Sequence, residues 1–299
     1  MECVSDTLLG EVKTLLLATD GSQFSEGAMQ EAFFFSQTCL AKLIVLHVVP
    51  TESESLRAAN FALRQGQEAL APYFEHIRAM AQASSADLEI VVIGSSSPEK
   101  AVVEQARLRG ADMILMGRHG KAGHLSRLVG KITSKVITQG FPQVLVVPKE
   151  ASLTGAHVLV GVNDTANSRQ AVRAAIRLSR QSKTFKKMTI MTVLQREEER
   201  QDAEDLVRAF CEQARIEGQI TACEPLVVTG ETVQAIVAAA QERQADMIIL
   251  GGPSKTSLSK LLLGNITENI IGQAHCAALV VTAQPDSDDP LSASTSSAS

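Results

Sequence analysis

Aromatic residues are scarce in this chain: they make up 3% of its 299 residues, with no Trp and one Tyr. A core built mainly of packed rings is therefore excluded. Apolar residues still account for 45% of the sequence, so the interior must consist of Val, Ile, Leu, Ala and Met. Such aliphatic interiors are typical of parallel strands that helices bury on both faces.

The chain also lacks an excess of basic residues. Its formal net charge is -5, which argues against a nucleic-acid partner, because such proteins usually present a basic face. No uninterrupted apolar stretch is long enough to span a bilayer, and no basic segment followed by an apolar run stands at the N-terminus. We therefore expect no membrane insertion and a cytoplasmic location.

Cysteines are few and widely spaced. The five positions are Cys3, Cys39, Cys211, Cys223 and Cys276, and none of them forms a C-x-x-C pair. This spacing weakens the case for a metal site or a dithiol. The sequence predicts buried, reduced thiols in a cytoplasmic protein.

An internal repeat divides the chain. The segment ADMILMG at residues 111–117 recurs as ADMIILG at residues 245–251, and another glycine follows thirteen positions later in each case, at Gly130 and Gly264. Upstream, LLLATDGS corresponds to VLVGVNDT, and we take Asp164 as the counterpart of Asp20. Three blocks in the same order indicate a tandem duplication.

The repeat sets the expected domain boundaries. The first unit spans about residues 8–150 and the second about residues 155–285. The join at residues 151–155 is short and polar, which favours two lobes that pack together. Residues 286–299 are rich in Ser and poor in apolar side chains, so we expect a disordered tail.

Apolar runs of strand length alternate with helical patterns in both units. The predicted strands are residues 14–18, 43–49, 88–93, 113–116 and 144–147, and then 158–162, 188–194, 220–228, 247–250 and 278–281. This alternation predicts an α/β fold with parallel sheets covered on both faces. Ligands bind such sheets beyond the carboxyl ends of the strands.

The chemically distinctive segment is the loop with the spacing G-x2-G-x9-G, at Gly117, Gly120 and Gly130. Glycines allow the backbone to approach phosphates closely, and the helix that follows offers unpaired N–H groups to an anion. Between residues 117 and 135 there are no acidic side chains and five basic ones, Arg118, Lys121, Arg127, Lys131 and Lys135, together with His119 and His124. This segment indicates an anionic partner.

This spacing resembles that of the universal stress protein family, whose ATP-binding members carry G-x2-G-x9-G-[S/T]. The resemblance extends over both units and includes TDGS after the first strand, LHVV at residues 46–49, MGRHGK at residues 116–121 and VLVVP at residues 144–148. It implies two doubly wound, Rossmann-like domains, each with five parallel strands. It also implies ATP, with or without Mg²⁺, in the first domain.

The resemblance further implies roles for individual residues. Asp20 and the backbone around Ala18 and Val48 would hold the adenine. Gly117, Arg118 and Gly120 would approach the ribose and phosphates, and residues 130–133 would surround the terminal phosphates. The complete expected set is Ala18, Thr19, Asp20, Val48, Gly94, Met116, Gly117, Arg118, Gly120, Gly130, Lys131, Ile132 and Thr133. His47, in an apolar strand, is expected to be a core histidine.

Two departures from the family pattern matter. Lys131 stands where the family has Ser or Thr, so a long point charge would meet the phosphate in place of a short hydroxyl. In the second unit Ser254 replaces the middle glycine, Asn265 occupies the Ser/Thr position, and the loop charge falls from +5 to +1. The second unit is therefore expected to be structural or regulatory.

The function that these patterns favour is nucleotide-dependent stress signalling or adaptation. Dedicated catalysis is not expected, because no nucleophile–base pair or metal cluster is evident. Slow ATP hydrolysis and the identity of a signalling partner stay open. One alternative is a nucleotide-free interaction module. Another is an adenylate-transfer or ATP-pyrophosphatase enzyme on a related fold, although its Ser-Gly-Gly loop is missing after the first strand.

The last strand of each unit is expected to mediate association. Residues 144–147 and 278–281 are apolar and fall at a sheet edge in the expected order, and an apolar edge invites pairing. Members of the family commonly pair through these strands. The resemblance therefore implies an internal pseudo-dimer of the two lobes, with homodimerisation of the whole chain as a further option.

Overall fold

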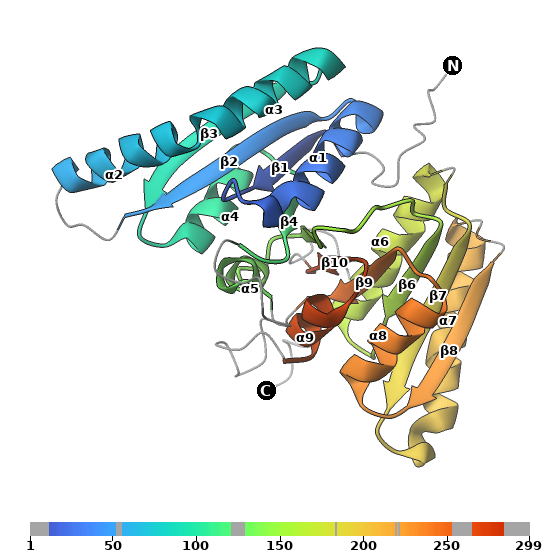
Figure 1. Ribbon diagram of the computed structural model, residues 1–299. Coiled ribbons are helices and arrows are strands. Elements are labelled where there is room, and N and C mark those ends of the chain that lie inside the picture. Colours follow the sequence, from blue (N-terminus) through green and yellow to red (C-terminus); the bar gives the residue numbers. More distant parts are fainter. Residues whose placement is uncertain are drawn as a thin grey trace, which may run out of the picture.

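Strands and helices alternate along both halves of the chain. A computed structural model describes residues 12–51, 56–120, 129–182, 184–218, 220, 222–252 and 265–283 (Figure 1). The first lobe contains β1 (Thr14–Ala18), α1 (Glu26–Cys39), β2 (Lys42–Pro50), α2 (Leu56–Ala69), α3 (Ala71–Ser84), β3 (Leu88–Ser95), α4 (Pro98–Leu108), β4 (Met113–Gly117), α5 (Lys131–Thr138) and β5 (Gln143–Val147). The second contains β6 (His157–Gly161), α6 (Ala166–Gln181), β7 (Lys187–Leu194), α7 (Arg200–Gly218), β8 (Cys223–Thr229), α8 (Thr232–Glu242), β9 (Met247–Gly251), α9 (Asn265–Gln273) and β10 (Ala277–Val281).

One ten-stranded sheet runs through both lobes, in the order β3-β2-β1-β4-β5-β10-β9-β6-β7-β8. Neighbouring strands are parallel within each lobe, and β5 and β10 meet antiparallel at the junction. The predicted α/β fold with two doubly wound halves is confirmed. So is the internal pseudo-dimer, because the final strands of the two lobes pair with each other.

The junction is nearly symmetric. Leu145 of β5 lies opposite Leu279 of β10. These two leucines are equivalent positions, since β4 pairs with β5 in the register in which β9 pairs with β10. An approximate two-fold axis therefore passes through this pair of residues.

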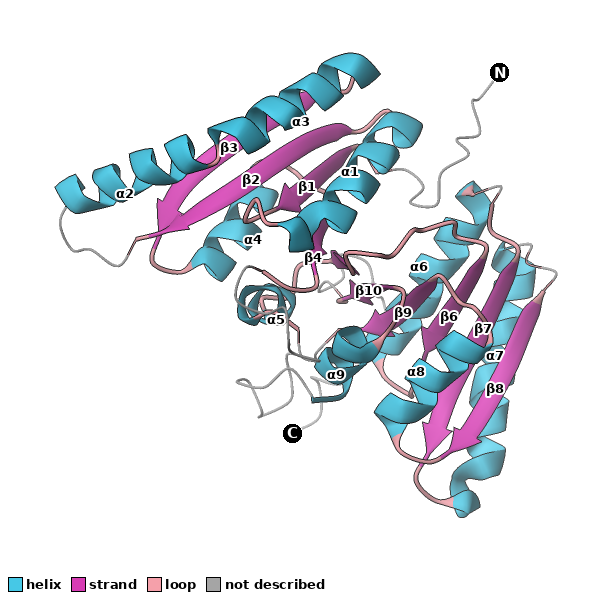
Figure 2. Ribbon diagram, viewed as in Figure 1, coloured by secondary structure: helices cyan, strands magenta, loops and turns pink. Residues whose placement is uncertain are grey.

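Helices cover both faces of the sheet (Figure 2). Successive strand residues face opposite sides, so Leu15 and Leu17 pack with α1 and α3 while Leu16 packs with α4 and α5. In the second lobe α6 and α7 continue the first core, whereas α8 and α9 cover the other face. Because the first core is continuous across the lobes, apolar burial itself holds them together.

Two local details differ from the sequence expectation. The long helical region after β2 is two helices, α2 and α3, separated at Leu70, where Pro72 in the first turn of α3 lacks the N–H that a continuous helix needs. Strand β8 begins at Cys223, three residues later than the apolar run suggested.

The join between the lobes is held by a carboxylate from each side. The Leu153 amide donates to Glu31 Oε1 of α1 at 3.1 Å. The Ala156 amide donates to Asp246 Oδ2 at 2.9 Å, just before β9. The join is thus fixed to both lobes, which accords with its short length.

The repeated ADMI segment has a structural explanation. In the first lobe, Asp112 Oδ2 accepts from the amides of Lys13 and Thr14 at 2.8 and 2.9 Å. Asp246 holds the entry to β6 in the equivalent way. Each aspartate therefore fixes the start of the central strand of its own lobe.

Some sequence predictions fall outside the described residues. These are the proposed tail at residues 286–299, Cys3, and the loop residues Lys121, His124, Arg127, Ser254 and Gly264. Within the described part of the chain, no helix combines the length and apolarity that crossing a membrane requires.

Candidate functional site

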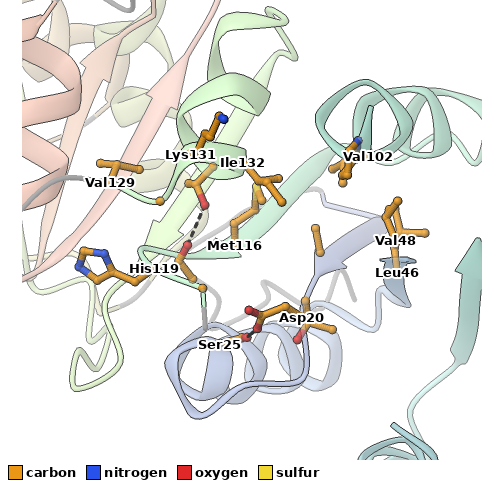
Figure 3. A pocket seen from close by; sticks show the side chains of 17 residues that line it. Asp20, Ser25, Leu46, Val48, Val102, Met116, His119, Val129, Lys131 and Ile132 are labelled. Carbon is orange, nitrogen blue, oxygen red and sulfur yellow. Dashed lines mark hydrogen bonds between the residues drawn. The ribbon is translucent and has the colours of Figure 1, made fainter. Parts of the chain in front are cut away.

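A cavity of about 470 Å³ lies in the first lobe at the carboxyl ends of β1, β2 and β4, beside the start of α5 (Figure 3). Its position is the one that open parallel sheets use for ligands, and its volume suits a small molecule. The lining residues are Ala18, Thr19, Asp20, Ser25, Leu46, Val48, Pro98, Val102, Met116, Gly117, His119, Gly120, Val129, Gly130, Lys131, Ile132 and Thr133.

The structure brings together all but two of the expected binding residues. Gly94 lies on β3 opposite Val49 and does not line the cavity. The side chain of Arg118 leaves the cavity for the second lobe. The expected set did not include Ser25, Leu46, Pro98, Val102, His119 and Val129. Leu46 and His119 stand within the LHVV and MGRHGK segments, whereas the other four carry no motif and meet the cavity only through the fold.

Asp20 is fixed at one end of the cavity by the turn that follows β1. Its Oδ1 accepts from the Ser22 amide at 3.0 Å and from Ser25 Oγ at 2.8 Å. Gly21 permits this turn with a φ of 69°. The carboxylate is therefore held in one orientation before any ligand arrives.

The glycines of the loop are required by close backbone contacts. A Cβ on Gly117 would lie 2.7 Å from the Phe24 carbonyl oxygen, and a Cβ on Gly120 would lie 2.8 Å from Asp20 Oδ2. Gly130 is less crowded, since its nearest contact would be the Arg118 carbonyl oxygen at 3.3 Å. The loop thus passes directly over Asp20.

The start of α5 faces the same cavity. The Gly130 amide donates to the Arg118 carbonyl at 2.8 Å, and Thr133 Oγ1 donates to the Gly117 carbonyl at 3.1 Å. These bonds tie α5 to the end of β4. Gly130, the N-cap, supplies no side-chain cap, so the first amides of the helix and its partial positive charge are directed at the cavity.

The basic side chains of α5 differ in environment. Lys131 lines the cavity and is exposed. Lys135, one turn later, instead pairs with Glu99 of α4 at 3.3 Å. Of the two lysines, only Lys131 is placed to meet an anion in the cavity.

His119 lines the cavity beside Val129 (Figure 3). Burial and the neighbouring charge of Arg118 hold the pKa of its imidazole below the ordinary value. Nδ1 of His119 is buried and has no hydrogen-bond partner among the described residues. The ring is therefore a neutral group at pH 7 with hydrogen-bonding capacity to spare.

One wall of the cavity is apolar. Figure 3 shows Val48 and Leu46 of β2 together with Val102 of α4, and Met116 and Ile132 extend this surface. An aliphatic surface of this kind suits an apolar ring. His47 points into the core behind the wall, as predicted: it is buried, and its Nδ1 lies 2.8 Å from the Thr19 carbonyl oxygen.

In the second lobe the structure corrects the match between Asp20 and Asp164. The amides of Thr19 and Val162 make equivalent bonds to β2 and β7, so the residue that follows each is equivalent, and Asn163 matches Asp20. Ser168 Oγ donates to Asn163 Oδ1 at 2.6 Å, as Ser25 does to Asp20. Asp164 lies on the surface and pairs with Arg169. Position-by-position alignment of LLLATDGS with VLVGVNDT also pairs Asp20 with Asn163, so the shared residue type alone had favoured the wrong neighbour.

Asn167 closes the corresponding region of the second lobe. Its Nδ2 donates to the Gly252 carbonyl at 2.6 Å, and its Oδ1 accepts from the Ala283 amide at 3.0 Å. The buried amide thus ties the end of β9 to the end of β10. Among the described residues, this lobe lacks the carboxylate that marks the first cavity.

The comparisons with known proteins agree with the geometry. The sequence profile of the universal stress protein family matches residues 11–148 and again residues 156–282. The chain belongs to this family. This universal stress protein is 30% identical over 138 residues to one of Thermus aquaticus, covering 45% of this chain and 98% of the relative.

A universal stress protein of Methanocaldococcus jannaschii is 40% identical over 55 residues, covering 18% of this chain and 32% of that protein. The match thus spans about a third of that relative's length. Among solved structures, a universal stress protein from Archaeoglobus fulgidus has a TM-score of 0.73 and 19% identity, covering 90% of this chain and 98% of that one. This likeness shows the shared two-lobed fold.

Proposed function

We propose that the first-lobe cavity binds an adenine nucleotide, with ATP, with or without Mg²⁺, as the preferred ligand. The supporting observation is that one cavity combines an aliphatic wall, a fixed carboxylate at Asp20 and a glycine loop that leads into the start of α5. An aliphatic wall suits a base, and exposed helix amides suit phosphates. Nucleotide occupancy would serve stress signalling or adaptation.

The residues proposed to hold the nucleotide are those of the expected set that line the cavity. Asp20 and Val48 lie on the side of β1 and β2 and would contact the adenine and ribose. Gly120, Gly130 and Lys131 lie beside the start of α5 and would contact the phosphates. Gly94 and the side chain of Arg118 are left out of this assignment.

The second lobe is proposed to be structural or regulatory. Asn163 replaces the carboxylate, and Asn167 ties the ends of β9 and β10 together. The lobe nevertheless supplies β10 as the neighbour of β5. On the basis of the repeat, we propose that the two domains span about residues 8–150 and 155–285.

Calorimetric titration of the full chain with ATP and with AMP tests the proposal. Lys131→Ala should weaken ATP roughly three- to tenfold, as expected for an exposed charge at a phosphate, and should weaken AMP less. Lys135→Ala is the matched control, because Lys135 lies on the same helix but pairs with Glu99. Its ATP affinity should stay unchanged.

Asp20→Asn converts the first lobe to the residue that stands in the second. We expect weaker ATP binding and reduced discrimination between ATP and GTP, because the carboxylate acceptor is lost. Absence of heat or affinity for every adenine nucleotide in the wild type would overturn the proposal and favour a nucleotide-free interaction module. Release of phosphate from bound ATP, measured in the same samples, tests slow hydrolysis.

A further inference from the structure

Two cysteines that stand 12 positions apart in the sequence meet in the core of the second lobe. Cys211 lies on the inner face of α7 with Val207 and Ala214, and Cys223 is the first residue of β8, which packs against α7 (Figure 1). The two sulfur atoms are 3.0 Å apart, and Cys223 donates to Cys211. Both side chains are buried.

A covalent bond between these sulfurs needs only a small movement. The S–S distance in a disulfide is about 2.05 Å, so the sulfurs must approach by about 1 Å.

The surroundings make the two sulfurs unequal. The hydrogen bond from Cys223, with the nearby charge of Arg215, lowers the pKa of the Cys211 thiol. The same hydrogen bond and burial raise the pKa of Cys223. Arg215 is fixed beside the pair, because its Nη2 donates to the Cys223 carbonyl at 2.9 Å. Cys211 is therefore the nucleophile and Cys223 the proton-bearing partner.

We propose that Cys211 and Cys223 form a site of reversible disulfide formation, with a peroxide as the two-electron oxidant. The Cys211 thiolate attacks one peroxide oxygen, the O–O bond breaks, and the departing hydroxide takes up a proton to become water. Cys211 is then a sulfenic acid. The Cys223 sulfur attacks the Cys211 sulfur, the S–O bond breaks, and hydroxide leaves with the Cys223 proton as water. Two thiols and one hydrogen peroxide thus give one disulfide and two waters.

The position of β8 gives the oxidant a route. β8 is the last strand at its edge of the sheet, and its only described strand neighbour is β7. Glu224 and Pro225, which follow Cys223, are exposed, and Pro225 has no amide to donate to a ladder. Local opening of such an edge admits a molecule as small as hydrogen peroxide. Once formed, the bridge would fasten β8 to α7 and oppose that opening.

Peroxide treatment of the reduced, native full chain tests the site. Peptide mapping without reductant should show a linked pair of peptides that contain Cys211 and Cys223, and dithiothreitol should release it. Cys223→Ser should instead trap a sulfenic acid at Cys211 that dimedone labels, whereas Cys211→Ser should give no such label at Cys223. Cys39→Ser and Cys276→Ser are the matched controls and should keep the bridge.

A thermal scan gives a second readout. The bridge closes a loop of about a dozen residues, so oxidised wild type should melt roughly 5 °C above the reduced form, and Cys211→Ala should abolish the difference. Wild type that keeps both thiols in peroxide, or forms the bridge only in denaturant, would overturn the proposal. Because the pair lies in the second lobe, this result is independent of nucleotide binding in the first.

Discussion

Arg118 Nη1 in the first lobe donates a hydrogen bond of 2.6 Å to the carbonyl oxygen of Ala274 in the second lobe. Ala274 directly follows α9, so the guanidinium lies at the carboxyl end of that helix, where a positive charge is favourable. Arg118 itself follows Gly117 at the mouth of the cavity. The loop beside the proposed nucleotide is therefore bonded to a helix of the opposite lobe.

Arg118→Ala should lower the free energy of unfolding by roughly 1.5–3 kcal/mol, the usual range for a hydrogen bond to a charged group. The reason is that the carbonyls at the end of α9 lose their donor across the junction. Urea denaturation of the full chain measures the effect. Arg107→Ala, on the exposed side of α4, is the control and should change stability by less than about 0.5 kcal/mol.

Gly117→Ala should destabilise the fold more than Gly130→Ala. The new Cβ at position 117 would lie 2.7 Å from the backbone oxygen of Phe24, which cannot move without displacing α1, whereas the closest approach at position 130 is 3.3 Å. We expect a loss above about 2 kcal/mol for the first variant and below about 1 kcal/mol for the second. Thermal unfolding without ligand separates them, and equal losses would show that Gly117 is not crowded.

Asn163→Ala should cost about 1 kcal/mol of stability, because Ser168 Oγ and Thr165 Oγ1 both donate to its side chain. Asp164→Ala should be nearly neutral, since the Asp164 side chain is 75% exposed and forms a surface ion pair. Chemical denaturation of the two variants compares these neighbours directly. A larger loss of stability at position 164 than at position 163 would favour Asp164 as the equivalent of Asp20 in the second lobe.

Glu31→Gln should leave the chain at least as stable as wild type at pH 7. Burial raises the pKa of the Glu31 carboxyl, with Asp246 adding to the effect, and the amide still accepts from Leu153. Because the pKa of Glu31 is higher in the folded protein than in the unfolded chain, ionisation of this carboxyl lowers the free energy of unfolding. The loss is absent below the unfolded pKa of 4.5 and is complete once the pH has risen through the folded-state pKa.

The stability gap between Glu31→Gln and wild type should therefore widen from pH 4 to pH 8, as measured by urea midpoints. Glu104→Gln, on the exposed side of α4, serves as the control and should show no such widening. A gap that narrows with rising pH would show that folding lowers the pKa of the Glu31 carboxyl instead of raising it.

The sequence predicted the strands well, because aliphatic runs are local signals, and the family resemblance implied the pairing of the lobes. Residues 14–18 coincide with β1, and the runs at 144–147 and 278–281 fall within β5 and β10. The resemblance to the universal stress protein family, of which the glycine spacing is one part, implied most of the residues that line the cavity.

What the sequence could not show depends on side-chain contacts between separate elements of the fold. The resemblance placed Arg118 at the ribose and phosphates. Its side chain instead donates to the Ala274 carbonyl of the other lobe, a contact that no local pattern indicates. Cys211 and Cys223 have no motif spacing, and only the packing of α7 on β8 brings them together.

The pair of Leu145 and Leu279 on the approximate two-fold axis has a consequence for stoichiometry. In a dimer of identical lobes, every substitution would occur on both sides of the axis. Because the two sides are separate parts of one polypeptide, the second lobe can have Asn163 at the position where the first lobe has Asp20. The second half still contributes its edge strand to the shared sheet. We therefore expect one nucleotide per chain, where an assembly of two equal lobes would take two.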